Sequence, residues 1–138
     1  MDSVNFEFLR GKFPELAELG GFAEHYAYSD PSSALIKLRK FSEQIVSRMY
    51  IQYDYGIPAG DSLNSMLSHR PFTIQTPNQI LSLFHSLRMA GNSAAHGASE
   101  SRTENALEAI LDAHRLGKWF HMAFGGGSAG DFKPFVKI

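Results

Sequence analysis

The segment that says most about how this chain folds is Phe84-His85-Ser86-Leu87-Arg88-Met89-Ala90-Gly91-Asn92-Ser93-Ala94-Ala95-His96-Gly97. At 3.6 residues per turn, four of its polar residues share one stripe of a helix. The small residues of its second half would let a neighbouring helix approach closely. A polar group in such a contact costs free energy unless it finds a partner or has a function. We therefore expect a buried polar network formed by His85, Arg88, Asn92 and His96.

Helix signals continue on both sides of this segment. A short helix is expected within residues 4–10 and a second from Pro14 to about Tyr28. Asp30 and Pro31 begin the most clearly amphipathic helix, which should end near Tyr53. Residues 70–75 are expected to form a loop. Further helices should begin at Asp61, at Thr76-Pro77-Asn78-Gln79 and at Ser101-Arg102-Thr103-Glu104. In the helix that follows Thr76, Gly91 should weaken the helix and Gly97 should end it. The last helix should reach about Phe124.

These segments predict an all-α fold, a single-domain antiparallel bundle of about five helices over residues 1–124. Residues 125–130 are rich in glycine and predict a flexible linker, so 125–138 is expected to lead toward a further domain. With 138 residues, of which 43% are apolar, the chain is long enough for one core.

The bulk composition narrows the class of protein. The net charge of −1 argues against a strongly basic nucleic-acid binder. The absence of cysteine excludes disulfides, thiolate metal sites and cysteine nucleophiles. No secretory signal and no membrane span is visible, so a cytoplasmic protein without a membrane partner is expected.

Several motifs together resemble a known family. They are Asn5-Phe6-Glu7-Phe8-Leu9, Ser29-Asp30-Pro31, Ala34-Leu35-Ile36-Lys37-Leu38-Arg39-Lys40-Phe41, Leu83-Phe84-His85-Ser86-Leu87-Arg88, Gly91-Asn92, Ala95-His96 and Lys118-Trp119-Phe120. In this order and spacing they resemble the N-terminal helical domain of the R subunit of type I restriction enzymes, over residues 4–124.

The resemblance implies a function in DNA restriction and modification. In the family, this domain precedes a nuclease domain and an ATP-driven motor, so the full-length protein is an ATP-dependent site-specific deoxyribonuclease that uses ATP and Mg²⁺. This chain holds no phosphate-binding loop. It is therefore expected to be a non-catalytic module without a cofactor. Its expected partners are the nuclease and motor domains of the same polypeptide, the methyltransferase and specificity subunits, and DNA through the complex.

An alternative is a distant resemblance to the HEPN superfamily of helical domains, several of which cut RNA as dimers. In that interpretation Arg88 would clamp a phosphate and His96 would transfer a proton. Seven residues separate the two, whereas the superfamily pattern has four to six, and Met89 replaces the usual polar residue after the arginine. The interpretation we favour is a structural role, with no catalytic residue in this chain.

Three further groups of residues have both a functional and an ordinary interpretation. Lys37, Lys40 and Arg48 share a helix face that could contact DNA phosphates, although a solvated charged face is the commoner arrangement. Trp119, Phe120 and Phe124 would be core or a docking edge, and such an edge could make an isolated copy dimerise. His114 and His121 share a face, but no tight ligand pair exists, so no metal site is predicted.

Overall fold

The computed structural model describes residues 1–56, 60, 62–97 and 101–138. Within those ranges the chain is all-α, as predicted, and holds no strand. The six α-helices are α1 (Pro14–Tyr26), α2 (Pro31–Tyr53), α3 (Leu63–Ser68), α4 (Arg70–Gln75), α5 (Asn78–His96) and α6 (Thr103–Ala123). Two short 3-10 helices, η1 (Glu7–Leu9) and η2 (Ala129–Asp131), lie near the two ends of the chain.

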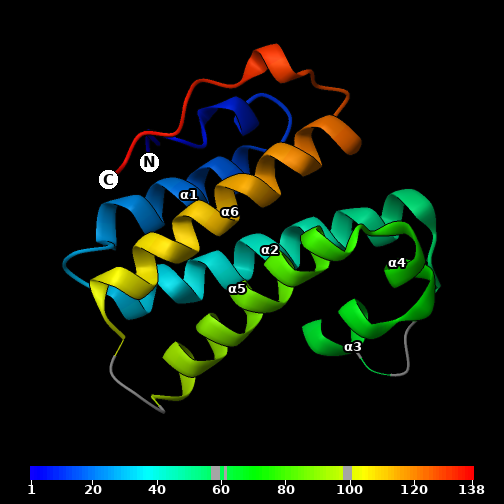
Figure 1. Cartoon of the computed structure of the whole chain (residues 1–138), viewed down its shortest axis with the longest axis horizontal. Helices are drawn as coiled ribbons and strands as arrows, with labels where there is room; N and C mark the ends of the chain where they lie inside the picture. The colour runs from blue at the N-terminus through cyan, green and yellow to red at the C-terminus, as the bar shows by residue number, and fades with distance from the viewer. Residues whose placement is uncertain (57–59, 61, 98–100) are drawn as a thin grey trace.

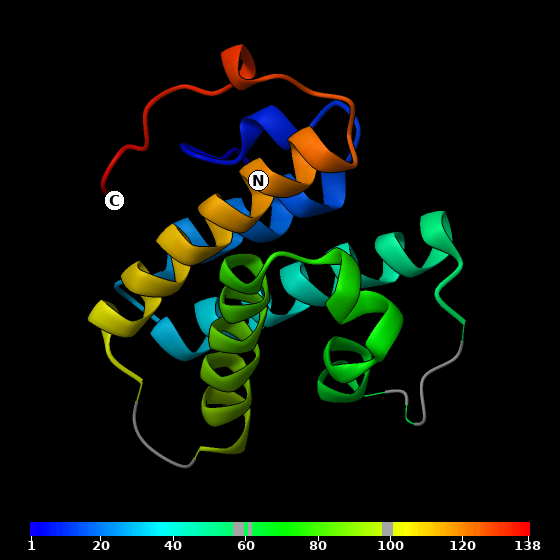
Figure 2. The same ribbon diagram turned by 45° about the vertical axis from the view of Figure 1, so that its right-hand side comes forward.

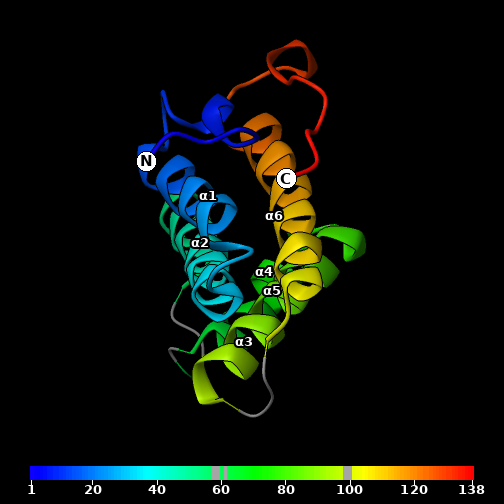
Figure 3. The same cartoon turned by 90° about the vertical axis from the view of Figure 1, so that its left-hand side faces the viewer.

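The four long helices alternate in direction along the chain, with α2 at the centre (Figure 1). Helix α2 contacts α1 on one side and α5 on the other, and α6 packs against all three of them. Figure 2 shows that α5 crosses α2 obliquely, and Figure 3 shows α1 and α6 as neighbours beneath the two terminal segments. None of the described helices combines the length and the apolar composition needed to cross a lipid bilayer.

Helix α2 forms as its sequence predicts. The Asp30 side chain accepts a hydrogen bond from the backbone N–H of Ser33, and Pro31 occupies the first turn, where its missing N–H costs nothing. The helix ends where Asp54 takes a left-handed conformation with φ 49°. The apolar face predicted from the helical period is buried, and it consists of Leu35, Leu38, Phe41, Ser42, Ile45, Val46 and Met49.

The segment Arg70–Gln75 is helix α4, so the prediction of a loop was wrong. The backbone N–H groups of Phe72 and Thr73 both donate to the carbonyl of His69, and Pro71 lies in the first turn of the helix. A proline in the first turn is compatible with a helix, so Pro71 does not exclude one here. Burial of Phe72 holds this short helix against the bundle.

The start signals of α5 and α6 also differ from the prediction. The Thr76 hydroxyl donates to the carbonyl of Phe72, 2.8 Å away, so it caps the end of α4 and does not begin α5. The capping residue of α6 is Arg102, whose backbone N–H donates to Asn105, one position beyond the predicted pair. The predicted cap Asp61 lies outside the described residues, and Ser62 caps α3.

Helix α5 is continuous through Gly91 from Asn78 to His96, so the expected weakening does not interrupt it. Gly97 ends the helix as predicted, with φ 62° and its N–H bonded to the carbonyl of Ser93. A glycine is favoured there because side-chain-bearing residues rarely adopt this left-handed conformation.

Residues 125–138 do not extend away from the bundle as a free linker would. The N–H groups of Gly125 and Gly127 bond to carbonyls at the end of α6. Beyond η2 the chain then runs back beside the N-terminal segment, where Val136 is hydrogen-bonded to Asn5 (Figure 1). In this structure the glycines of residues 125–127 form a tight turn, and the assignment of residues 125–138 as a linker toward a further domain stays a prediction.

Candidate functional site: the polar cavity between α2, α3 and α5

The predicted polar stripe lies on α5, but its members differ in burial. His85, Arg88 and Asn92 are half-buried, whereas His96 is exposed at the last turn of the helix. No hydrogen bond in the described structure joins His96 to the other three. The expectation of one buried network of four residues is therefore corrected, because the end of α5 projects beyond the helices that cover its middle.

Asn92 finds its partner on a different helix. The Nη1 group of Arg39, on α2, donates to Asn92 Oδ1 at 2.7 Å. The Nε atom of Arg39 lies 3.2 Å from a carboxylate oxygen of Glu43, one turn further along α2. Arg39 is therefore held between an amide and a carboxylate. The hydrogen bond to Asn92 is charge-assisted and therefore stronger than one between neutral groups, whereas the contact with Glu43 is an ion pair without a hydrogen bond from Nε.

Gly91 makes this contact possible. A Cβ atom placed on Gly91 would overlap the Cβ of Arg39, so α5 and α2 touch at this point through the glycine backbone. Sequence reasoning expected a close approach near Gly91 but missed Arg39 and Glu43. The available signal was an arginine one turn before a glutamate on the central helix, a pattern too common on exposed helix faces to be singled out.

Arg88 and His85 form a second pair within α5. The Nε group of Arg88 donates to Nδ1 of His85 at 3.4 Å. Burial lowers the pKa of His85, and the neighbouring charge of Arg88 lowers it further. The neutral imidazole can then act as the acceptor that this hydrogen bond requires.

Arg88 and Asn92 of α5, together with Arg39 and Glu43 of α2, line a cavity of about 260 Å³ between α2, α3 and α5. The arginines and Glu43 give the lining two positive charges and one negative charge. Such a cavity suits a carboxylate, a phosphate or a backbone carbonyl. The residues that line it are Arg39, Glu43, Ser62, Leu63, Asn64, Arg88 and Asn92.

The structure does not bring Arg88 and His96 together as a reactive pair. Eight positions along a helix correspond to a rise of roughly 12 Å. Arg88 lines the cavity, whereas His96 is exposed and is not among the residues of that lining. A shared site on one chain is therefore not formed by these two residues.

Two of the three cations proposed for phosphate contact have partners in the structure. The Lys37 ammonium lies 4.9 Å from the ring centroid of Phe22. Arg48 forms an ion pair with Glu15 and lies over the ring of Phe13. Lys40 is exposed. The cation face is thus partly used within the fold, and DNA contact through it stays a prediction.

The aromatic residues at the end of α6 are divided between core and surface. Phe120 is buried and stacks against Phe124 with ring centroids 5.5 Å apart. Trp119 and Phe124 are half-buried, and Phe124 also meets Tyr53 of α2 edge to face. Beside them Ile51 is 82% exposed. This end of the bundle therefore presents an apolar surface that rests on a rigid aromatic cluster.

The two histidines that share a face of α6 are both buried but have different surroundings. His114 lies against the rings of Phe6, Phe8 and Phe135, and burial lowers its pKa to about 4. His121 lies 2.9 Å from a carboxylate oxygen of Asp131. Among the described residues, no group of three or more His, Asp or Glu side chains is placed to hold a metal ion.

Comparison with known proteins gives one informative relative. The chain is similar to the endonuclease subunit of the type I restriction enzyme EcoKI from Escherichia coli strain K12. The two are 29% identical over 121 residues, which cover 88% of this chain and 10% of that subunit. No protein-family model matches the chain, and no solved structure is significantly similar to it. The chain is related to a restriction-enzyme subunit and spans about a tenth of its length.

Proposed function

We propose that this chain is a non-catalytic helical module of the R subunit of a type I restriction system, and that it supports the assembly of the complex. One observation carries the proposal: the similarity to an endonuclease subunit extends over 88% of this chain but only 10% of the relative. DNA cleavage and translocation, with their ATP and Mg²⁺, would then belong to other domains of such a subunit.

The surface we propose for assembly is the aromatic end, defined as Phe13, Ile51, Tyr53, Phe120 and Phe124. A shallow cavity of about 240 Å³ lies among Phe13, Arg48, Ile51, Gln52, Phe120 and Phe124. Ile51 and Tyr53 are 82% and 42% exposed, although both are large and apolar in character. Exposed apolar side chains beside a cavity, with Phe13 and Phe120 buried beneath them, are a feature of protein interfaces.

The side chains of the aromatic end also pack against one another, which favours binding. Phe13 and Phe120 are in contact with ring centroids 4.8 Å apart, and Tyr53 and Phe124 with centroids 4.9 Å apart. Side chains already fixed by such contacts lose little conformational entropy when a partner covers them. The expected partners are the other domains of the subunit and the methyltransferase and specificity subunits of the same system.

Co-purification tests this function. The tagged chain is mixed with the methyltransferase and specificity subunits of the same restriction system, and captured protein is quantified. Ile51→Glu should reduce capture by at least about tenfold, since a central apolar contact is worth more than 1.4 kcal/mol. The matched control is Met89→Glu on α5, where the methionine is 55% exposed and its helix contributes no residue to the aromatic end. It should leave capture unchanged.

Circular dichroism establishes that both variants retain the helical fold. Equal capture by wild type and Ile51→Glu would contradict a role for the aromatic end. Cleavage of RNA by the purified wild-type chain that disappears in His96→Ala would contradict the non-catalytic assignment itself.

A further inference from the structure

Residues 132–138, here called the strap, lie along a groove between the N-terminal segment 3–8 and α6. The strap contains neither helix nor strand. Side chains of the groove hold the strap, and it does not pair with a β-strand in the described part of the chain. We propose that this groove is a docking site for an extended peptide, and that the strap is its resident ligand. The proposal does not depend on the assembly role of the aromatic end.

The first observation is a two-point contact between Asn5 and a peptide backbone. The N–H of Val136 donates to Asn5 Oδ1 at 2.8 Å, and Asn5 Nδ2 donates to the carbonyl of Val136 at 2.9 Å. A carboxamide that pairs with both groups of one residue recognises an extended backbone and not a particular side chain. Main-chain pairing of this kind supplies affinity in known modes of peptide recognition.

Asn5 is fixed in place independently of the strap. Its Nδ2 group also donates to Glu24 on α1 at 3.0 Å, and its backbone N–H donates to the same carboxylate at 2.9 Å. Asn5 is 7% exposed and Glu24 is 7% exposed. Glu24 therefore orients the Asn5 carboxamide whether or not the strap is bound, which lowers the entropic cost of binding a peptide.

The second observation is that two phenylalanines of the strap, three residues apart, each pack against aromatic rings of the groove. Phe132 meets the rings of Phe8 and His121 with centroid distances of 5.1 and 5.6 Å. Phe135 meets the ring of His114 with a centroid distance of 5.0 Å. The two contacts of Phe132 are edge to face and that of Phe135 is tilted, and ring pairs of this kind favour aromatic over aliphatic side chains. The ligand class is thus an extended segment of the form Phe-x-x-Phe followed by a residue that pairs with Asn5.

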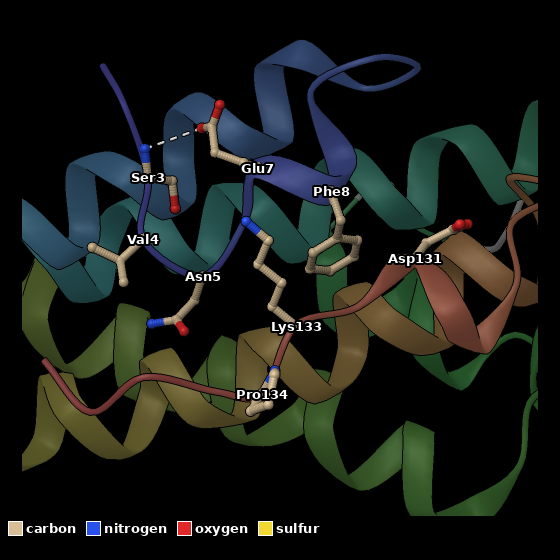
Figure 4. Close-up of a pocket in the computed structure, with 8 residues that line it drawn as sticks. All are labelled: Ser3, Val4, Asn5, Glu7, Phe8, Asp131, Lys133 and Pro134. Carbon is tan, nitrogen blue, oxygen red and sulfur yellow. Dashed lines mark hydrogen bonds between the residues drawn. The ribbon is translucent and has the colours of Figure 1, made fainter.

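The strap rests on the surface and does not fill the core. Its aromatic residues are half-buried, and Lys133, Pro134, Val136 and Lys137 are exposed. A cavity of about 310 Å³ remains between the strap and the N-terminal segment, lined by Asn5, Phe8, Lys133 and Pro134 among others (Figure 4). Pro134 restricts the backbone between the two aromatic residues and favours the extended form.

A compact turn connects the strap to α6. A Cβ on Gly127 would overlap the His121 ring, so this turn requires glycine. Asp131 then accepts hydrogen bonds from the N–H of Ser128 and from His121, each at 2.9 Å. These contacts direct the strap into the groove while leaving its own seven residues attached by few hydrogen bonds.

The test uses the whole chain with its strap weakened. A fluorescein-labelled peptide with the sequence of residues 128–138 is titrated against the Phe132→Ala/Phe135→Ala variant and against wild type, with anisotropy as the readout. The variant should bind the peptide at least about tenfold more tightly, because the strap of wild type competes for the groove. Equal binding by the two proteins would overturn the proposal.

Two altered peptides serve as matched controls. One carries an N-methyl group on Val136, which removes the donor to Asn5 and keeps every side chain. The other has alanine in place of both phenylalanines. Each should bind the variant at least about tenfold more weakly than the parent peptide, since a hydrogen bond or an aromatic contact is lost. Unchanged affinity of the N-methylated peptide would show that the groove does not recognise the backbone.

A measurement on wild type covers the case in which the variant fails to fold. The amide of Val136 should exchange with solvent more slowly than that of Lys137. Unlabelled peptide at millimolar concentration should accelerate exchange at Val136 several-fold by displacing the strap. Exchange at Val136 that is unaffected by the peptide would mean that the strap is a fixed part of the fold, and the proposal would fail.

Discussion

Gly91 of α5 lies directly against Arg39 of α2, with no room between them for a Cβ atom on the glycine. Gly91→Ala should therefore destabilise the protein even though alanine is the better helix former. Overpacking costs about 1–3 kcal/mol, against a gain in helix propensity of about 1 kcal/mol. We expect the free energy of unfolding to fall by up to about 2 kcal/mol in urea titrations followed by circular dichroism. Ser93→Ala, at an exposed position of the same helix, is the control and should not be destabilising.

Alanine substitutions of Asn92 and His96, which share the polar stripe of α5, should have different effects on the free energy of unfolding. Asn92→Ala removes the acceptor of the Arg39 guanidinium and should lower the free energy of unfolding by about 1–2 kcal/mol. His96→Ala should change it by less than about 0.5 kcal/mol, because the side chain is exposed. Thermal and urea unfolding of both variants checks this. A larger loss for His96→Ala than for Asn92→Ala would restore the network expected from the sequence.

Glu24 holds the N-terminal segment on α1. Its carboxylate accepts hydrogen bonds from the Ser3 hydroxyl, the N–H groups of Val4 and Asn5, and the Asn5 carboxamide. Glu24→Gln replaces one acceptor oxygen by a donor that faces other donors, so about 2–3 kcal/mol of stability should be lost. Glu18→Gln is the control on the same helix. Its carboxylate pairs with the N-terminal ammonium and with Arg10, but it is exposed, so solvent screens these contacts and the loss should be much smaller. Equal losses from both variants would argue against a special role for Glu24.

Acid should destabilise the fold through His114. Its pKa is about 4 in the folded chain and 6.5 without the fold, because burial among aromatic rings disfavours the charged form. Between these values the unfolded chain binds more protons than the folded chain, so stability rises with pH across this window and is lost as pH falls through it. Melting temperatures measured from pH 7 to pH 4 should show this decline.

The variant His114→Phe isolates that contribution. Phenylalanine keeps the ring contacts but cannot take up a proton, so the decline in melting temperature between pH 6.5 and pH 4 should become shallower. His25→Gln, at an exposed position of α1, should leave the pH profile as it is in wild type. A profile of His114→Phe that coincides with wild type would exclude His114 as a source of the acid sensitivity.

The helices were predictable where the sequence carries local signals. Asp30 and Pro31 define the start of α2, Gly97 the end of α5, and the apolar period of residues 35–49 the buried face of α2. Each of these depends on contacts within one or two turns of the chain. The segment Arg70–Gln75 was missed because a proline in a first turn and a proline in a loop leave the same local pattern.

The sequence alone therefore determined the class of the fold, most of its helices and the place where α5 must approach a neighbour, because local backbone and side-chain physics suffices for these. Only the tertiary structure decided which polar groups meet. Arg39 and Asn92 are 53 residues apart, and Asn5 and Val136 are 131 residues apart. Local sequence patterns do not show that residues so far apart in the chain meet in space. These contacts follow from how α2, α5 and the two terminal segments pack. The same packing leaves His96 in solvent while it half-buries Asn92, one turn earlier on the same stripe.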